Sequence, residues 1–144
     1  GPFGAAVFAG PTLVAAGVNC VLSSGFSIAH AEIVAIMRAQ RALAQHAFPG
    51  PFSLVSSAEP CCQCFGALVW SGVDELIYGA TREDVEAIGF DEGPKPDRWA
   101  DVLREKGIAV LEQLARADAN VALGRYAARG GPIYGLRHPN VKKA

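Results

Sequence analysis

The charged residues of this chain are concentrated in its second half, which restricts how it can fold. The chain has 13 Lys and Arg and 14 Asp and Glu, yet residues 1–31 contain none of them. The only charged residues before Asp74 are Glu32, Arg38, Arg41 and Glu59. The uncharged stretch holds no run of about 18 apolar residues, so it is not a membrane span. It also lacks the positive leading region of a signal peptide. We therefore expect a buried sheet near the N-terminus and a solvated face after residue 74.

Length and composition predict one compact domain spanning residues 1–144. Hydrophobic residues make up 51% of the chain, which excludes disorder. A net charge of −1 does not favour nucleic acid, because binding a phosphate backbone requires clustered Lys and Arg. Four cysteines are too few for a disulfide scaffold, and three of them lie within positions 61–64. This spacing indicates metal binding or catalysis in a reducing compartment, so we expect a cytoplasmic protein.

Apolar runs and turn residues predict alternating strands and helices. Strands are expected at 4–9, 12–19, 52–57, 75–79 and 108–111. Helices are expected at 30–47, 60–71, 82–88, 97–107 and 113–128, and segment 20–29 is expected to be a loop. Pro60 suits the first position of its helix, and Asp97 suits the N-cap of another. This order predicts an α/β domain with three layers.

Two short motifs carry the chemistry, His30-Ala31-Glu32 and Pro60-Cys61-Cys62-Gln63-Cys64. Cys61 and Cys64 share one face at a helix start, where the positive helix end favours thiolates. Two thiolates and an imidazole suit Zn²⁺, and three protein ligands leave a fourth position open for catalysis. The pattern H-x-E followed by P-C-x-x-C is the signature of zinc nucleobase deaminases. We therefore predict one zinc ion per chain, held by His30, Cys61 and Cys64.

Glu32 is the expected proton shuttle. It is the only carboxylate in the first 58 residues, and a buried acid is costly without a role. A carboxylate beside the metal can take a proton from the attacking water and deliver one to the departing amine. Residues two apart do not share a helical face. His30 must therefore lie at the entrance of its helix for both side chains to reach one centre.

The cysteines have other interpretations. A Cys-x-x-Cys pair also occurs in redox proteins, which need no His-x-Glu, and in structural zinc sites, which need a fourth ligand. Cys20 is the only spare cysteine for that role, and we expect Cys20 and Cys62 to be small buried residues. His46 and His138 are expected on the surface. A non-catalytic zinc-binding module is a further alternative, although it gives Glu32 no reason to be retained.

The stretch from residue 30 to residue 94 resembles bacterial guanine deaminases, within the cytidine deaminase-like superfamily. The segments that carry the resemblance are residues 30–33, 57–67, Trp70, 86–94 and the opening 1–5. The Ile-Gly-Phe-Asp-Glu run at 88–92 favours guanine deaminase, since the zinc motif says little about the substrate. The resemblance implies an α/β/α sandwich with a five-stranded mixed sheet. Family members normally have a helix before the first strand. Because this sequence begins at that strand, we expect one face of the sheet to be partly uncovered.

The resemblance implies conversion of guanine to xanthine and ammonia. It assigns Glu92 as a second acid that contacts the base and helps the amine to leave. Asn19 and the backbone amide of Ala31 would hydrogen-bond the purine, and Phe3 and Trp70 would form apolar walls. Hydrogen-bonding groups discriminate between ligands far more strongly than apolar walls do. Asn19 and Glu92 are therefore expected to set specificity.

The resemblance also implies a homodimer whose C-terminal segments cross between subunits, with Tyr134 reaching the neighbour's site. The expected partner is a small nucleobase, with no membrane involved. One alternative function is that of a tRNA adenosine deaminase, which shares the zinc motif but needs a basic surface and a wider opening to its active site. Another is a deaminase of a triazine, pterin, cytosine or modified guanine, because two or three side chains can retune a pocket.

Overall fold

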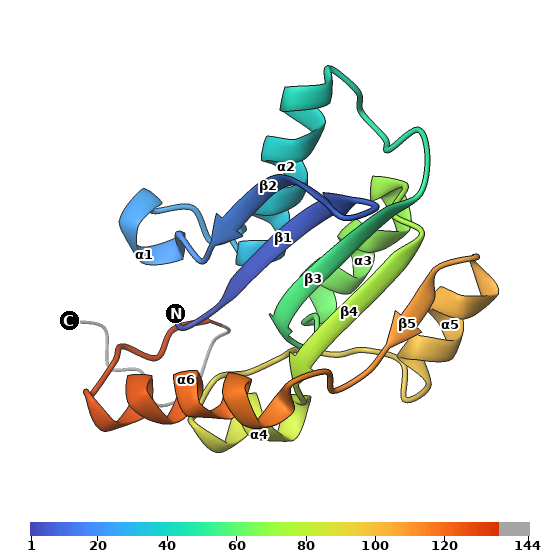
Figure 1. The fold of residues 1–144 in the computed structure, drawn as a ribbon. Coiled ribbons are helices and arrows are strands. Elements are labelled where there is room, and N and C mark those ends of the chain that lie inside the picture. The colour runs from blue at the N-terminus through green and yellow to red at the C-terminus, as the bar shows by residue number, and fades with distance from the viewer. Residues whose placement is uncertain (136–144) are drawn as a thin grey trace.

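The computed structural model describes residues 1–135. The expectation for His138 lies outside these residues. Five strands form one sheet in the order β2-β1-β3-β4-β5 (Figure 1). The strands are β1 (Gly4–Ala9), β2 (Thr12–Val18), β3 (Phe52–Ala58), β4 (Glu75–Ala80) and β5 (Ala109–Leu111). β1 is antiparallel to β2 and β3, whereas β3, β4 and β5 are parallel. The five-stranded mixed sheet is therefore confirmed.

One face of the sheet carries the main core. Helices α2 (Ala31–Leu43), α3 (Cys62–Ser71) and α5 (Trp99–Glu105) contribute to one cluster of buried side chains with β1, β3 and β4. The largest fully buried side chains of this cluster are Leu54, Leu68, Leu76, Leu103 and Val7. Burying each such side chain contributes roughly 1.5–3 kcal/mol. The core fixes the starts of α2 and α3 against the sheet.

The opposite face is covered only in part. Helix α6 (Arg116–Ala128) crosses the end of β4, beside the short helix α4 (Arg82–Ala87) (Figure 1). The approach of α6 requires glycine at position 79, because a Cβ there would lie 2.9 Å from the Cβ of Ala119. Beside α6, the side chains of Ala6, Val55 and Ile77 are only half-buried. The three-layer architecture is confirmed.

Helices α3 and α5 each begin two residues later than predicted. Helix α3 begins at Cys62, because Cys61 is extended at ψ 174° and acts as its N-cap. Pro60 therefore lies before the helix rather than at its first position. Helix α5 begins at Trp99 with Arg98 as N-cap. Asp97 is not the cap, since the Trp99 N–H donates to the Pro96 carbonyl and places Asp97 inside the preceding turn.

Other boundaries also differ from the prediction. A short helix α1 (Val21–Ser24) lies inside the predicted loop. Helix α2 ends at Leu43 instead of 47, because Ala44 is left-handed at φ 53°. Helix α6 starts at Arg116, after Ala115 at φ 54°. Within residues 1–135, no helix is both long and apolar enough to cross a membrane.

Candidate active site

Three metal-ligating side chains converge where two helices begin. His30 is the N-cap of α2, in extended conformation at ψ 157°. Cys61 is the N-cap of α3, and Cys64 lies in the first turn of that helix. The Nδ1 atom of His30 lies 3.3 Å from Cys61 Sγ and 3.7 Å from Cys64 Sγ. The expected place of His30 at the helix entrance is confirmed.

The donor set fits zinc. All three ligand atoms lie within 4.8 Å of one another. A tetrahedral zinc ion places its sulfur and nitrogen ligands about 3.6 Å apart, given its usual bond lengths. The two sulfur-to-nitrogen distances at His30 bracket that value. His30, Cys61 and Cys64 therefore form a three-ligand zinc site with room for a fourth, non-protein ligand.

The protonation of the two thiols differs sharply in the metal-free protein. Hydrogen bonding with Cys64 and His30 lowers the pKa of Cys61 to about 4. Hydrogen bonding with Cys61, together with burial, raises the pKa of Cys64 above its usual range. The hydrogen bond with Cys61 also raises the pKa of His30. Because a metal binds thiolates, zinc binding here releases a proton from Cys64.

Glu32 lies directly beside the three zinc ligands. Its side chain is buried in the first turn of α2, and burial raises its pKa. The hydroxyl of Ser56 donates to Oε1 at 3.1 Å, and Cys64 Sγ donates to Oε2 at 3.4 Å. Both carboxylate oxygens are thus held in place. A carboxyl fixed so close to a metal site is well placed to hold and move a proton.

Glu92 approaches from the loop between α4 and α5. It is only 7% exposed, and its Oε2 is buried without a hydrogen-bond partner within residues 1–135. Burial, with the nearby Cys61 thiolate, raises the pKa of Glu92 to about 8. Near neutral pH this carboxyl is therefore largely protonated in the metal-free protein, and it can donate a hydrogen bond to a ligand.

One cavity of about 490 Å³ is lined by the zinc ligands His30 and Cys61 and by both carboxyl groups, Glu32 and Glu92. Aromatic rings line one side: Phe90 contacts Phe3 at 5.1 Å and Tyr134 at 5.4 Å between ring centroids, both edge to face. Asn19 lines the same cavity, and its Oδ1 accepts from Tyr134 Oη at 2.5 Å and from the Val21 N–H at 3.2 Å. The Nδ2 group of Asn19 is then the side-chain donor left for a ligand.

Some residues lie in other places than the sequence analysis expects. Trp70 is 82% exposed on α3 and does not line the cavity, because it points away from the helix face that carries Cys64. Ala31, the first residue of α2, is wholly buried between the cavity-lining residues His30 and Glu32 and does not itself line the cavity. Tyr134, expected to reach a neighbouring subunit, lines the cavity of its own chain. Cys62 is half-buried in the cavity wall rather than in the core.

Sequence reasoning missed four residues at this site. Ser56 holds Glu32, Phe90 forms the centre of the aromatic wall, and Glu59 and Lys95 pair beneath the Glu92 loop. Phe90 stood inside the Ile-Gly-Phe-Asp-Glu run, which could have drawn attention to it. Ser56 lies 24 residues from Glu32, and no local pattern indicates that contact.

The fold and the site together define a zinc-dependent deaminase domain: two helix starts on a mixed sheet present His, Cys and Cys beside a buried Glu. The chain belongs to the family described as the cytidine and deoxycytidylate deaminase zinc-binding region, which matches residues 1–80.

Known relatives extend the comparison beyond the zinc motif. The chain is 48% identical to the guanine deaminase of Nitrosomonas europaea, covering 89% of this chain and 74% of that one at a TM-score of 0.86. A structure of NE0047 in complex with 2,6-diaminopurine is also 48% identical, covering 94% and 75% at a TM-score of 0.87. The curated guanine deaminase of Bacillus subtilis is 36% identical over 92 residues, which are 64% of this chain. This chain spans 58% of the length of that curated relative.

Proposed function

We propose that this protein hydrolyses guanine to xanthine and ammonia. The observation that carries the proposal is that two buried carboxyl groups, Glu32 and Glu92, line the same cavity as the zinc ligands His30 and Cys61. Similarity to the Nitrosomonas europaea guanine deaminase over 89% of the chain supports the choice of guanine.

The reaction replaces the C2 amino group of guanine by an oxygen from water. A C2–O bond forms, the C2–N bond breaks, and the amine leaves as ammonia. When bound, zinc would polarise the attacking water and lower its pKa toward about 7. Glu32 would accept the proton of that water and transfer it to the ring. Glu92, a buried carboxyl in the same cavity, would donate a proton to the departing amine. The second proton of the water, lost as the C2=O bond forms, would replace the proton that Glu92 gives up.

The remaining cavity residues would recognise the base. Guanine is planar and neutral, so aromatic walls and a few fixed polar groups suit it. Phe3, Phe90 and Tyr134 would supply the walls, and the Nδ2 of Asn19 would donate to an acceptor on the purine. No Lys or Arg lines the cavity within residues 1–135, which argues against a tRNA substrate.

Ammonia release from a panel of bases tests this function. The zinc-loaded protein should release ammonia from guanine, and Glu32→Gln should reduce turnover by about 10²–10⁴-fold, the usual contribution of a general acid–base group. Bound zinc, measured on the same samples, should not change. Inclusion of 2,6-diaminopurine, adenine, cytosine, amino-substituted triazines and pterins decides between guanine and a related heterocycle. Inertness toward guanine with turnover of another base would refute the proposed substrate.

We also propose that the protein is a cytoplasmic homodimer. None of the four cysteines forms a disulfide, which fits a reducing compartment. Trp70 is 82% exposed, and Phe26 is 68% exposed. Contact with a second copy would remove the apolar surface of these aromatic side chains from water. Sedimentation velocity should show twice the mass of one chain, and a monomer at micromolar concentration would contradict this.

A further inference from the structure

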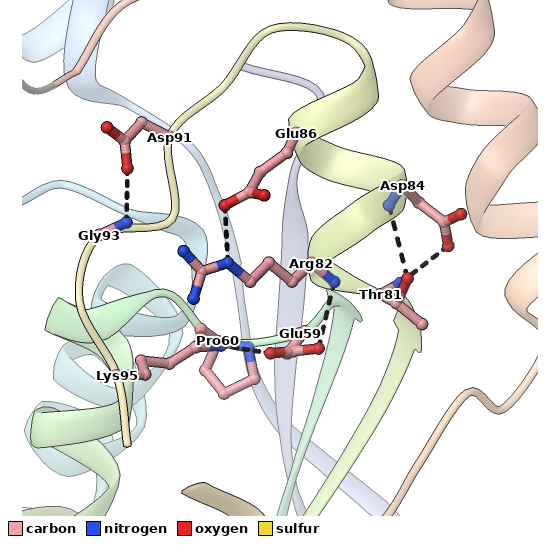
Figure 2. A network of polar contacts seen from close by, with 9 residues as sticks. All are labelled: Glu59, Pro60, Thr81, Arg82, Asp84, Glu86, Asp91, Gly93 and Lys95. Atoms are coloured by element: carbon pink, nitrogen blue, oxygen red, sulfur yellow. Dashed lines mark hydrogen bonds and ion pairs between the residues drawn. The ribbon is translucent and has the colours of Figure 1, made fainter. Parts of the chain in front are cut away.

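A buried ion pair ties the loop that carries Glu92 to the residue that follows β3. Lys95, three residues after Glu92, pairs with Glu59, and their side chains are 1% and 8% exposed (Figure 2). The Lys95 Nζ also donates to the Pro60 carbonyl at 2.7 Å and lies 4.7 Å from the ring centroid of Trp99. Lys95 therefore holds the peptide that leads directly into Cys61.

Glu59 anchors this pair to the rest of the fold. Its Oε2 accepts from the backbone N–H of Arg82 at 3.1 Å, and its own N–H donates to the Ala80 carbonyl at 2.8 Å. A buried ion pair is weak support for stability by itself, because well-packed apolar residues often replace it without loss. The best-attested role of a buried ion pair is to favour one backbone conformation over others. Here that conformation includes the Glu92 loop.

The connection from Lys95 to Glu92 is short and constrained. Gly93 is left-handed at φ 67°, and its N–H donates to Asp91 Oδ1 at 2.7 Å (Figure 2). The Glu92 carbonyl accepts from the Cys62 N–H at 2.9 Å, which ties the loop to the start of α3. The Oε2 of Glu92 has no partner of its own in the described chain. The backbone tether therefore sets where this carboxyl lies.

We propose that Lys95 and Glu59 are positioning residues, which hold the loop so that the Glu92 carboxyl lies over the zinc ligands. This inference rests on the proposed function, in which Glu92 protonates the leaving amine. The pair contributes no atom to the reaction. It acts by fixing the backbone that carries Glu92 relative to Pro60 and Cys61.

Lys95→Met removes the ammonium and leaves a side chain of similar length. Turnover of guanine should fall about a hundredfold, as expected for a reacting group displaced by about 1 Å, with KM changed much less. Arg82→Met is the matched control, because Glu59 accepts from the Arg82 backbone and not from its guanidinium. Arg82→Met should retain wild-type turnover. A Lys95→Met variant with wild-type turnover would overturn the proposal.

Two further variants separate positioning from folding. Glu59→Gln/Lys95→Met removes both charges, so no unpaired buried charge remains, and its thermal stability should recover relative to Lys95→Met. Its turnover should stay low, and recovery of turnover along with stability would overturn the proposal. In the Glu92→Gln background, adding Lys95→Met should cause no further loss of turnover. Losses that multiply would show that Lys95 acts independently of Glu92.

Amide hydrogen exchange tests the tether without any activity. In zinc-loaded Lys95→Met, the Cys62 amide and the amides of residues 89–95 should exchange faster than in Arg82→Met. Unchanged exchange would overturn the tether whatever the substrate is. If the wild type is inert toward guanine but the exchange result holds, the proposed function fails while the positioning of the loop stands.

Discussion

The hydroxyl of Ser56 donates a hydrogen bond of 3.1 Å to Oε1 of Glu32. Ser56 is buried on β3, and Glu32 is buried in the first turn of α2. This contact joins the sheet to the helix whose N-cap is His30. It leaves the Oε2 of Glu32 facing Cys64 at 3.4 Å, on the side of the zinc ligands.

Ser56→Ala should reduce turnover without affecting zinc binding. The variant frees Oε1 of Glu32 and leaves a buried carboxyl oxygen without its donor, a change that costs about 1–3 kcal/mol. If that energy is lost at the transition state, turnover falls by roughly 5–150-fold. Ser53→Ala is the matched control, because Ser53 lies on the same strand but donates to Glu75. Equal turnover of both variants in the ammonia assay would contradict a role for Ser56.

Substituting a zinc ligand should remove both the metal and part of the stability. Cys64→Ser and His30→Ala are expected to lose bound zinc, measured by elemental analysis, and to melt at lower temperature than the zinc-loaded wild type. The physical reason is that binding free energy of a metal to the folded state adds to folding free energy. Cys20→Ser is the control, since Cys20 lies outside the ligand set and its side chain donates only to the Val18 carbonyl. Full zinc content in Cys64→Ser would contradict the assigned site.

Glu92 should make the stability of the metal-free protein depend on pH. Its folded pKa of about 8 lies above the ordinary value of 4.5. The folded state therefore holds a proton that the unfolded state releases. The stabilisation is fully present below pH 4.5 and is lost as pH rises toward 8. The largest change from this group is about 5 kcal/mol.

Urea unfolding of the metal-free wild type and of Glu92→Gln between pH 5 and pH 8 measures this effect. Gln does not titrate, so the stability of the variant relative to wild type should increase as pH rises. Parallel stability curves would mean that Glu92 titrates equally in the folded and unfolded chain.

Phe3 and Trp70 should differ in their effect on substrate binding. Phe3 packs edge to face against Phe90 in the cavity wall, whereas Trp70 is 82% exposed on α3. Phe3→Ala should raise the KM for guanine about tenfold, since an aromatic contact of this kind is worth about 0.5–1.5 kcal/mol beyond its buried area. Trp70→Ala, assayed at high protein concentration to preserve any oligomer, should leave KM unchanged. The reverse order of effects would restore Trp70 as a wall of the site.

The sequence by itself determined which segments form strands, that helices follow residues 30 and 60, and which three side chains are the candidate zinc ligands. These features depend on local rules. Alternation and helical periodicity act over a few residues, and a Cys-x-x-Cys pair at a helix start has its geometry set within one turn. The position of His30 at the entrance of α2 followed from the same rule, because His and Glu two apart reach one centre only there.

Tertiary structure alone decided which side chains surround those ligands. Lys95 meets Glu59 across 36 residues, and Ser56 meets Glu32 across 24, so neither contact leaves a local pattern. Trp70 shares a helix with Cys64 but points to solvent, because its orientation depends on where the core lies around that helix. Long-range packing selects one arrangement from many that local periodicity permits equally, and for that reason the wall and the supports of the site emerge only in the folded chain.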